Sequence, residues 1–271
     1  NKPLNFNNKF LLLGSPKLDT IYELPNKDYP LPQDWQNKIY DENGNKKTII
    51  LYATTLKTLF SDIDTWFENL ETIINFFKNR NDSVCILRLH PQTIQTIKLL
   101  KSDYVDKYNE IFYSIEENNN FILDETKDFH IAFKISDCYF GEESSLLCLY
   151  FATGKPFGWC ANRGGDWFAP VNDEDTTFDR VLNWQIANMK NYPGGNIYNA
   201  NCCIWWDNFI DSNKTETFMR LFIHYVQHQN EYPQTEEYKR LKREMLEKYY
   251  ANADGTASKK IYEFIKNKVL K

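Results

Sequence analysis

The chain has 271 residues, of which 42% are hydrophobic and 16% aromatic, so it is long enough for one large domain or two small ones with a sizeable core. Its formal net charge is −5, from 32 basic and 37 acidic residues without long blocks of like charge. This balance argues against nucleic-acid binding, which needs a basic face.

The six cysteines predict neither a disulfide framework nor a zinc site. None of them forms a CxxC pair, and four lie inside apolar runs, which is typical of a protein kept reduced in the cytoplasm. No apolar run reaches the ~18 residues that a membrane helix needs. The expected location is therefore the cytoplasm.

The chain opens on a polar stretch, residues 1–9, which we interpret as a linker from the middle of a longer protein. A short apolar strand is expected from Phe10 to Leu13. Gly14 and Ser15 follow with turn chemistry, which would place backbone N–H groups at the carboxyl end of that strand. Open α/β sheets bind their ligands at this edge, so both residues are candidate phosphate contacts.

The run TIILYA, Thr48–Ala53, predicts a buried strand. Thr54, Thr55 and Lys57 come directly after it. Hydroxyl groups and a lysine at the end of a strand can contact phosphate, although an ordinary loop between a strand and a helix uses similar residues. The pattern leaves both interpretations open.

A helix is expected over Asp62–Arg80, because large apolar residues recur there at intervals of three and four. The next strand, Ser83–Leu89, carries Arg88 and His90 to its end, and Pro91 suits the first turn of a following helix. A lone histidine is more often structural than catalytic. At this junction between strand and helix, His90 is nevertheless a candidate for the site.

Further helices are expected at Thr93–Leu100, Tyr104–Glu116 and Phe129–Ile135, with a strand at residues 121–124. The stretch that organises the chain follows. It consists of a strand over Asp137–Phe140, a turn at Gly141, a buried helix over Leu146–Ala152, and a further strand-like run that ends at Cys160.

Ser144 and Ser145 lie where the buried helix should begin. Such a pair can simply cap the helix by accepting hydrogen bonds from its first backbone N–H groups. Alternatively, the hydroxyl groups act together with the exposed N–H groups and the partial positive charge of a helix N-terminus, and hold a phosphate. Both interpretations remain open from these residues alone.

Strands alternate with helices from residue 10 to residue 160, which predicts an α/β fold with a Rossmann-like, doubly wound parallel sheet over residues 10–200. Residues 201–271 are expected to add C-terminal helices packed on the same domain. Helices are expected near Phe178–Lys190 and at Glu216–Gln229, Thr235–Tyr250 and Ser258–Leu270, the last with Thr256 as its N-cap.

His224 and His228 have the i, i+4 spacing that places two side chains on one face of a helix. No acidic or cysteine partner stands at a recognisable spacing from them. We therefore expect no metal site.

Six short islands occur in one order along the chain: GSPKLD at 14–19, ILYATTLK at 50–57, LRLHP at 87–91, SDCYFGEESS at 136–145, TGKP at 153–156 and ADGTASKKI at 253–261. In this order they resemble the CDP-glycerol glycerophosphotransferase family, the teichoic-acid primases and polymerases. The corresponding family islands look like G-x-P-R-x-D, LYAPT-x-R, R-x-HP, a block ending in DYSS, NKP and a late DGKAS. The HP after its strand and the SS before its helix are the most specific pair.

The sequence also departs from that pattern. The DY before SS is Glu142-Glu143 here, the Pro-Thr is Thr54-Thr55, and the late Lys is Thr256. These changes are compatible with a different alcohol on the donor or with reduced activity.

The resemblance implies a GT-B architecture, in which two Rossmann-like halves face each other and the C-terminal half holds the donor nucleotide. This chain looks like that C-terminal half alone. The implied partners are CDP-glycerol or a related CDP-alcohol, a polyol-phosphate or glycan acceptor, and a missing N-terminal half. The family uses no further cofactor and works at the inner face of the cell membrane.

The resemblance also implies roles for single residues. Ser144 and Ser145 would donate to the diphosphate, and His90 would donate to the transferring or leaving phosphate. Lys57 and Arg88 are weaker candidates for the same task, since alternation along the strand could turn Arg88 away. Glu142 would bind a donor hydroxyl or orient a neighbouring residue, because a carboxylate beside phosphate is repulsive. No residue here suits the base that activates the acceptor, so that base would belong to the missing half.

Two other functions fit the same pattern. Nucleotide-sugar glycosyltransferases and UDP-sugar epimerases use the same paired Rossmann architecture, and fold does not fix function. A non-catalytic scaffold domain in surface-polymer assembly is the third possibility, permitted by the altered residues beside Ser144.

Overall fold

The computed structural model describes residues 11–142, 144–161, 205–207, 212–231 and 254–268, together with single positions at 236, 240, 244, 250 and 270. Their centre is a six-stranded sheet in the order β3-β2-β1-β4-β5-β6, with every pair of neighbours parallel. The strands are β1 (Thr48–Ala53), β2 (Ser83–Arg88), β3 (Phe121–Leu123), β4 (Cys138–Glu142), β5 (Phe157–Ala161) and β6 (Trp205–Asp207).

The strand order has a switch point. The chain runs from β1 outward to β2 and β3, and then crosses back to place β4 on the other side of β1. A parallel sheet that reverses its winding direction in this way is Rossmann-like and doubly wound. The predicted fold class is therefore confirmed, and the switch point lies between β1 and β4. Open sheets of this kind bind their ligands at the carboxyl ends of the strands.

The expected strand over Phe10–Leu13 is wrong for the residues that can be described. Leu11, Leu12 and Leu13 belong to no strand of the sheet and lead directly into the first helix. The Leu12 side chain is 80% exposed, so this apolar run does not have the burial that a central parallel strand needs. Gly14 and Ser15 consequently do not follow a strand of this sheet.

The other predicted elements agree closely with the structure. The helices are α1 (Pro16–Tyr22), α2 (Gln33–Ile39), α3 (Leu56–Ser61), α4 (Ile63–Phe77), α5 (Thr93–Leu100), α6 (Val105–Glu116), α7 (His130–Ile135), α8 (Ser145–Phe151), α10 (Ser212–Gln227) and α12 (Ala257–Lys268). The expected helix near Phe178–Lys190 lies outside the described residues, and so does most of Thr235–Tyr250. No helix in the described part of the chain is both long and apolar enough to cross a membrane.

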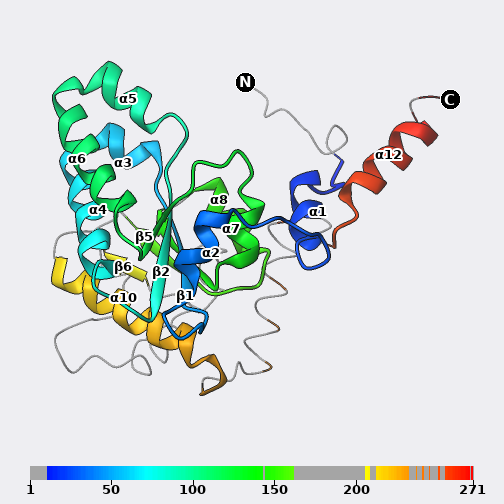
Figure 1. Cartoon of the computed structure of the whole chain (residues 1–271). Helices are drawn as coiled ribbons and strands as arrows, with labels where there is room; N and C mark the ends of the chain where they lie inside the picture. The colour runs from blue at the N-terminus through cyan, green and yellow to red at the C-terminus, as the bar shows by residue number, and fades with distance from the viewer. Residues whose placement is uncertain are drawn as a thin grey trace.

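Each face of the sheet is buried under its own layer of helices. On β1, Ile50 and Tyr52 point into a core shared with α4, α6 and α10, whereas Ile49 and Leu51 point into a second core shared with α2, α7 and α8. Figure 1 shows these two groups of helices on opposite sides of the sheet. Because both faces are covered, the central strands are apolar throughout rather than alternating.

The sheet continues past residue 200, where the sequence suggested that the Rossmann-like part would end. Its last strand, β6, comes from residues 205–207 and pairs with β5. Helix α10 then packs against α4, β1 and β6, so this part of the C-terminal region completes the sheet and its cover.

Gly141 lies where β4 passes closest to β1, paired with Ala53 in the parallel register. A Cβ atom at this position would clash with the Ala53 carbonyl oxygen and would lie 3.2 Å from the Ala53 nitrogen. Both obstacles are backbone atoms of a buried strand, which cannot move independently. Glycine is therefore required for β4 to pair with β1 at the switch point.

Asp19 joins the two ends of the described chain. Its carboxylate accepts the backbone N–H groups of Ala257 at 3.0 Å and Ser258 at 2.7 Å, the first two residues of α12. The Thr256 hydroxyl, which was expected to cap this helix, instead donates to Asp254 at 2.6 Å. The prediction of Thr256 as a side-chain cap is thus wrong, because a carboxylate from α1 occupies that place. Figure 1 shows α1 and α12 side by side.

Lys155 of the TGKP island also caps the end of a helix. Its ammonium group donates to the carbonyl oxygens of Phe133, Lys134 and Ser136 at 2.7, 2.9 and 2.6 Å. These are carbonyls at the end of α7, which have no partner within the helix. Burial lowers the pKa of Lys155 to about 8, so the side chain still carries its proton at neutral pH.

Gly141→Ala should destabilise the protein by about 3 kcal/mol or more, because the added methyl group would overlap two backbone atoms of Ala53 and crowd the Tyr139 ring. The measurement is the free energy of unfolding in urea. Gly44→Ala is the matched control, since its Cβ would meet nothing within 4 Å and would cost only the strain of a residue at φ +80°, about 1 kcal/mol. Equal losses for the two variants would contradict the close approach.

Asp19→Asn should release α12 and lower the free energy of unfolding by about 2 kcal/mol at neutral pH, since one acceptor is lost and an amide donor faces an N–H group. Although burial works in the opposite direction, the hydrogen bonds from Ser258 and Ala257 outweigh it and lower the pKa of Asp19. The stabilisation is therefore present above the unfolded value of 3.8 and is lost as pH falls through the lower pKa of the folded state.

Hydrogen exchange of the α12 amides should accelerate in Asp19→Asn while exchange in β1 and β2 changes less. Asp28→Asn, at an exposed aspartate in the loop after α1, is the control. An unchanged α12 in the first variant would show that the carboxylate does not hold this helix.

Candidate functional site

The carboxyl edge of the sheet collects side chains from four loops. Thr54 and Thr55 follow β1, His90 follows β2, Asp124 follows β3, and Ser144 follows β4. Because all strands are parallel, these loops emerge at the same edge. β1 lies between β2 and β4, so His90 and Ser144 leave strands that are about 10 Å apart, two strand spacings.

Glu142, the last residue of β4, connects this strand to α3 by hydrogen bonds. Its Oε2 atom accepts the Thr55 hydroxyl at 2.5 Å, the Thr58 hydroxyl at 3.0 Å and the Thr55 backbone N–H at 3.2 Å. The residue is only 5% exposed. One carboxylate oxygen of Glu142 thus connects the end of β4 to Thr55 in the loop after β1. Thr54, a further candidate residue, directly precedes Thr55.

The second oxygen of Glu142 is different. Oε1 is buried and has no hydrogen-bond partner among the residues that the structure describes, and the same holds for the hydroxyl of Thr54. Burial raises the pKa of Glu142, and the hydrogen bonds from Thr55 and Thr58 oppose this only in part. The charge of exposed Lys57 acts in the same lowering direction.

Ser144 has the capping role that the sequence allowed. Its hydroxyl accepts the Leu147 backbone N–H at 3.0 Å at the start of α8 and lies 3.4 Å from the Tyr139 hydroxyl. Ser145 is the first residue of the helix and is exposed. Capping by Ser144 is therefore confirmed, whereas phosphate binding by the two hydroxyls stays a prediction.

His90 is exposed at the start of the loop after β2. Its Nδ1 atom accepts the backbone N–H of Gln92 at 3.2 Å. A neutral imidazole that accepts at Nδ1 carries its proton on Nε2. This hydrogen bond therefore fixes the tautomer and makes Nε2 a donor toward whatever lies next to the loop.

A pocket of about 300 Å³ opens beside His90, at the carboxyl ends of β2 and β3. Its lining comes from the loops after these strands and from α5 and α6: Arg88, Leu89, His90, Pro91, Thr93, Ile94, Tyr108, Leu123, Asp124, Glu125, Thr126 and Lys127. Two of the predicted site residues, Arg88 and His90, meet here. Alternation along β2 therefore does not turn Arg88 away from the edge.

Arg88 is paired within the pocket. Its guanidinium group donates to the buried carboxylate of Asp124 and to the Thr126 carbonyl, the latter at 3.0 Å. The charges of the lining balance, since Arg88 and Lys127 are matched by Asp124 and Glu125. A lining without excess positive charge suits an uncharged polar group better than a diphosphate.

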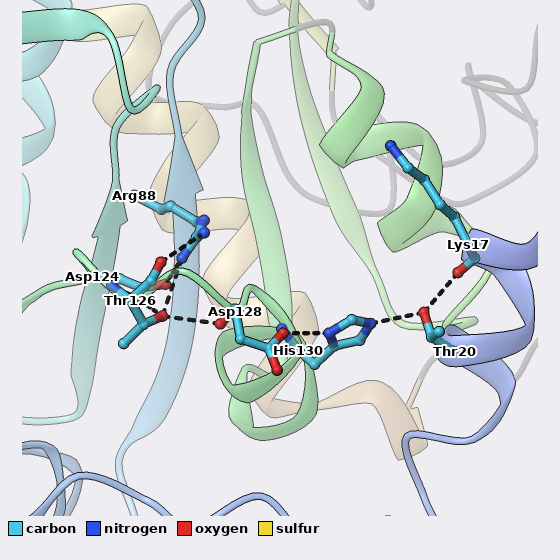
Figure 2. A network of polar contacts seen from close by, with 7 residues as sticks. All are labelled: Lys17, Thr20, Arg88, Asp124, Thr126, Asp128 and His130. Carbon is cyan, nitrogen blue, oxygen red and sulfur yellow. Dashed lines mark hydrogen bonds and ion pairs between the residues drawn. The ribbon is translucent and has the colours of Figure 1, made fainter.

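Figure 2 shows that this ion pair belongs to a longer network. The Thr126 hydroxyl contacts Asp124 at 2.6 Å and the Asp128 carbonyl at 2.9 Å, and the Asp128 carboxylate contacts Nδ1 of His130. His130 Nε2 then reaches the Thr20 hydroxyl of α1 at 2.7 Å. The pocket wall is thereby connected through polar contacts to the helix that follows Gly14 and Ser15.

The second wall of the pocket, residues 124–127, was missed from the sequence. The available signal was the polar stretch DETKD at 124–128, which begins at the last residue of the short run FILD, at the end of a parallel strand. Four charged residues in one loop are also typical of a solvated turn. Only the neighbouring position of β3 and β2 makes this loop the partner of His90.

Gly14 and Ser15 stand apart from the other predicted residues. Gly14 has a φ of 94°, a left-handed conformation, and Ser15 is the N-cap of α1 but makes no capping side-chain hydrogen bond. Helix α1 packs against α8 and α12. Phosphate binding by these two residues stays a prediction.

His224 of α10 and His228, the residue directly after this helix, lie next to each other, with ring centroids 4.2 Å apart. No group of three or more His, Cys, Asp or Glu residues within the described ranges is arranged to hold a metal ion.

No family model matches the chain, and no curated protein does. Solved structures that are similar in fold include the putative UDP-N-acetylglucosamine 2-epimerase from Listeria monocytogenes, at 15% identity with a TM-score of 0.48 over 94% of this chain and 51% of that one. The wall teichoic acid polymerase TagF, soaked with CDPG, has 17% identity, a TM-score of 0.42 and coverage of 97% and 51%. The S. aureus MnaA–UDP co-structure has 16% identity, a TM-score of 0.46 and coverage of 94% and 52%.

The chain thus spans about half the length of these structures. At such identities and TM-scores the similarity assigns neither a family nor an activity.

Glu142→Gln should remove a pH dependence of stability. The glutamine oxygen can still accept from Thr55 and Thr58, but the side chain cannot ionise. Because the folded pKa of Glu142 is raised above the unfolded value of 4.5, the folded state holds the proton more tightly. Wild-type stability should therefore fall, relative to the variant, as pH rises from about 4.5 toward neutrality.

Urea unfolding at several pH values measures this difference, with Glu42→Gln, at an exposed glutamate, as the control. Parallel pH profiles for wild type and Glu142→Gln would show that burial does not perturb this carboxyl.

Proposed function

We propose that this chain is the donor-binding domain of a transferase that moves a glycerol-phosphate or related polyol-phosphate group from a CDP-alcohol to an acceptor hydroxyl, with release of CMP. The observation that carries the proposal is the pocket beside His90, at the carboxyl edge of a doubly wound sheet and next to its switch point. Open parallel sheets bind nucleotides at this edge. The order of the HP, SS and late ADGTAS islands favours a cytidine nucleotide on the donor.

In this proposal the nucleotide lies across the edge of the sheet. The pocket at β2 and β3 receives the nucleoside, because its charges cancel and its lining is partly apolar. The diphosphate then extends past His90 toward the loops after β1 and β4. Arg88 was predicted to contact phosphate, but here it belongs to the nucleoside pocket, because the Asp124 carboxylate already balances its charge.

The chemistry is phosphoryl transfer. An acceptor hydroxyl oxygen forms a bond to the β-phosphorus, the bond from that phosphorus to the bridging oxygen breaks, and CMP leaves with the electron pair. The hydroxyl proton passes to a base. Catalysis of such a step consists of holding the groups in line and offsetting negative charge. His90 supplies an Nε2 donor, and Ser145 and Lys57 are exposed near the same edge.

No described residue suits the base that would accept the proton of the acceptor hydroxyl. We therefore assign the base to a second half of the protein, which would also bind the polyol-phosphate or glycan acceptor. The chain described here would bind the donor without turning it over. Its place of action would be the cytoplasm, at the inner face of the cell membrane.

The test is calorimetry of the chain with CDP-glycerol, CDP-ribitol and UDP-sugars. We expect binding of a CDP-alcohol, and silence toward every cytidine nucleotide would contradict the proposal. Preference for a UDP-sugar would instead favour a nucleotide-sugar glycosyltransferase or epimerase. Retained biological activity of a full-length protein that binds no nucleotide would favour a scaffold.

His90→Asn tests the catalytic role in the full-length protein. Asparagine can still accept the Gln92 N–H group but lacks the Nε2 donor, so we expect a loss of about one to two orders of magnitude in transfer rate. Thermal unfolding should be unchanged because His90 is exposed. Replacement of exposed His224 by Asn is the matched control and should leave the rate as it is.

A further inference from the structure

We infer that Glu125 is a specificity-determining residue that selects a cytosine base by accepting a hydrogen bond from its exocyclic amino group. The inference rests on the proposed function, since it concerns the nucleoside pocket at β2 and β3. It adds a residue that neither the predicted site nor the resemblance contained.

Glu125 is the one carboxylate of the pocket lining that has no task within the protein. Asp124, beside it, is buried and bonded to Arg88 and Thr126. Glu125 is exposed, and within the described residues it makes no hydrogen bond and no ion pair. An acceptor at a pocket wall that serves no structural purpose is available to a ligand.

Glu125 shares the pocket lining with an aromatic side chain. Tyr108 lines the same pocket, and burial, followed by the charge of Glu125, raises the pKa of Tyr108 to about 12. The Tyr108 ring is held by stacking on Phe112, with ring centroids 4.1 Å apart. The exposed Glu125 carboxylate therefore belongs to the same lining as a stacked aromatic ring and the apolar side chains of Leu89, Ile94 and Leu123.

Donors are present in the same lining. The guanidinium of Arg88 has five N–H donors, and its bonds to Asp124 and Thr126 do not use all of them. The pocket thus offers the Glu125 carboxylate as an acceptor and the Arg88 guanidinium as a donor.

This set matches cytosine and not uracil. Cytosine presents an amino donor at N4 and acceptors at N3 and O2, and carboxylates accept from N4. Uracil presents an oxygen at the same corner and an N–H group at N3, so a carboxylate there would face a second acceptor. Uracil would therefore set its O4 acceptor against the Glu125 carboxylate, so a cytidine nucleotide should bind more tightly than a uridine nucleotide.

The experiment is equilibrium binding of CDP and UDP to the chain and to two variants. We expect the wild type to bind CDP at least tenfold more tightly than UDP. Glu125→Gln should lower this ratio at least tenfold, because a glutamine amide can accept from N4 or donate to O4. Glu110→Gln, at an exposed glutamate on α6 outside the pocket lining, should keep the wild-type ratio.

The other possible outcomes distinguish base selection by Glu125 from nucleotide binding by the chain. Equal binding of CDP and UDP by the wild type, or an unchanged ratio in Glu125→Gln, would overturn the role of Glu125 and leave donor binding intact. Binding of neither nucleotide would overturn both. A tenfold weaker affinity of Glu125→Gln for both nucleotides alike would show that the residue supports the pocket without reading the base, and would also overturn the inference.

Discussion

The close approach between β4 at Gly141 and β1 at Ala53 is the constraint on which the arrangement of the site depends. Only a residue without a side chain lets the two central strands pair there. This pairing sets the switch point, and the switch point brings the loops after β1 and β4 to one edge. Glu142 follows immediately and holds α3 against that edge through Thr55 and Thr58.

Several polar residues in the islands that resemble glycerophosphotransferases have structural tasks. Asp19 caps α12, Lys155 caps α7, and Ser144 caps α8. Each one satisfies backbone groups that a helix end leaves without partners. These three residues therefore have structural roles, whereas His90 lies in the lining of the pocket at the carboxyl ends of β2 and β3.

The distribution of charge divides the edge into two parts. At β2 and β3 the formal charges of the pocket cancel, and Asp124 compensates Arg88 within the wall. His90 stands at the border, with its Nδ1 atom engaged by the backbone and its Nε2 atom free to donate. The edge of the sheet thus combines a charge-balanced pocket with a hydrogen-bond donor at the end of the neighbouring strand.

The sequence by itself determined the local elements and the winding of the sheet, because apolar runs and helix periodicity depend on near neighbours. It also identified His90 and the serine pair at strand ends. It wrongly predicted a strand before Gly14, because the sequence of an apolar run does not show whether the run is buried in a sheet. Only the tertiary structure decided that residues 124–127 face His90, that Asp19 replaces Thr256 as the cap, and that Arg88 is already paired. These contacts join residues 36 to 239 positions apart, and no local pattern records such distances.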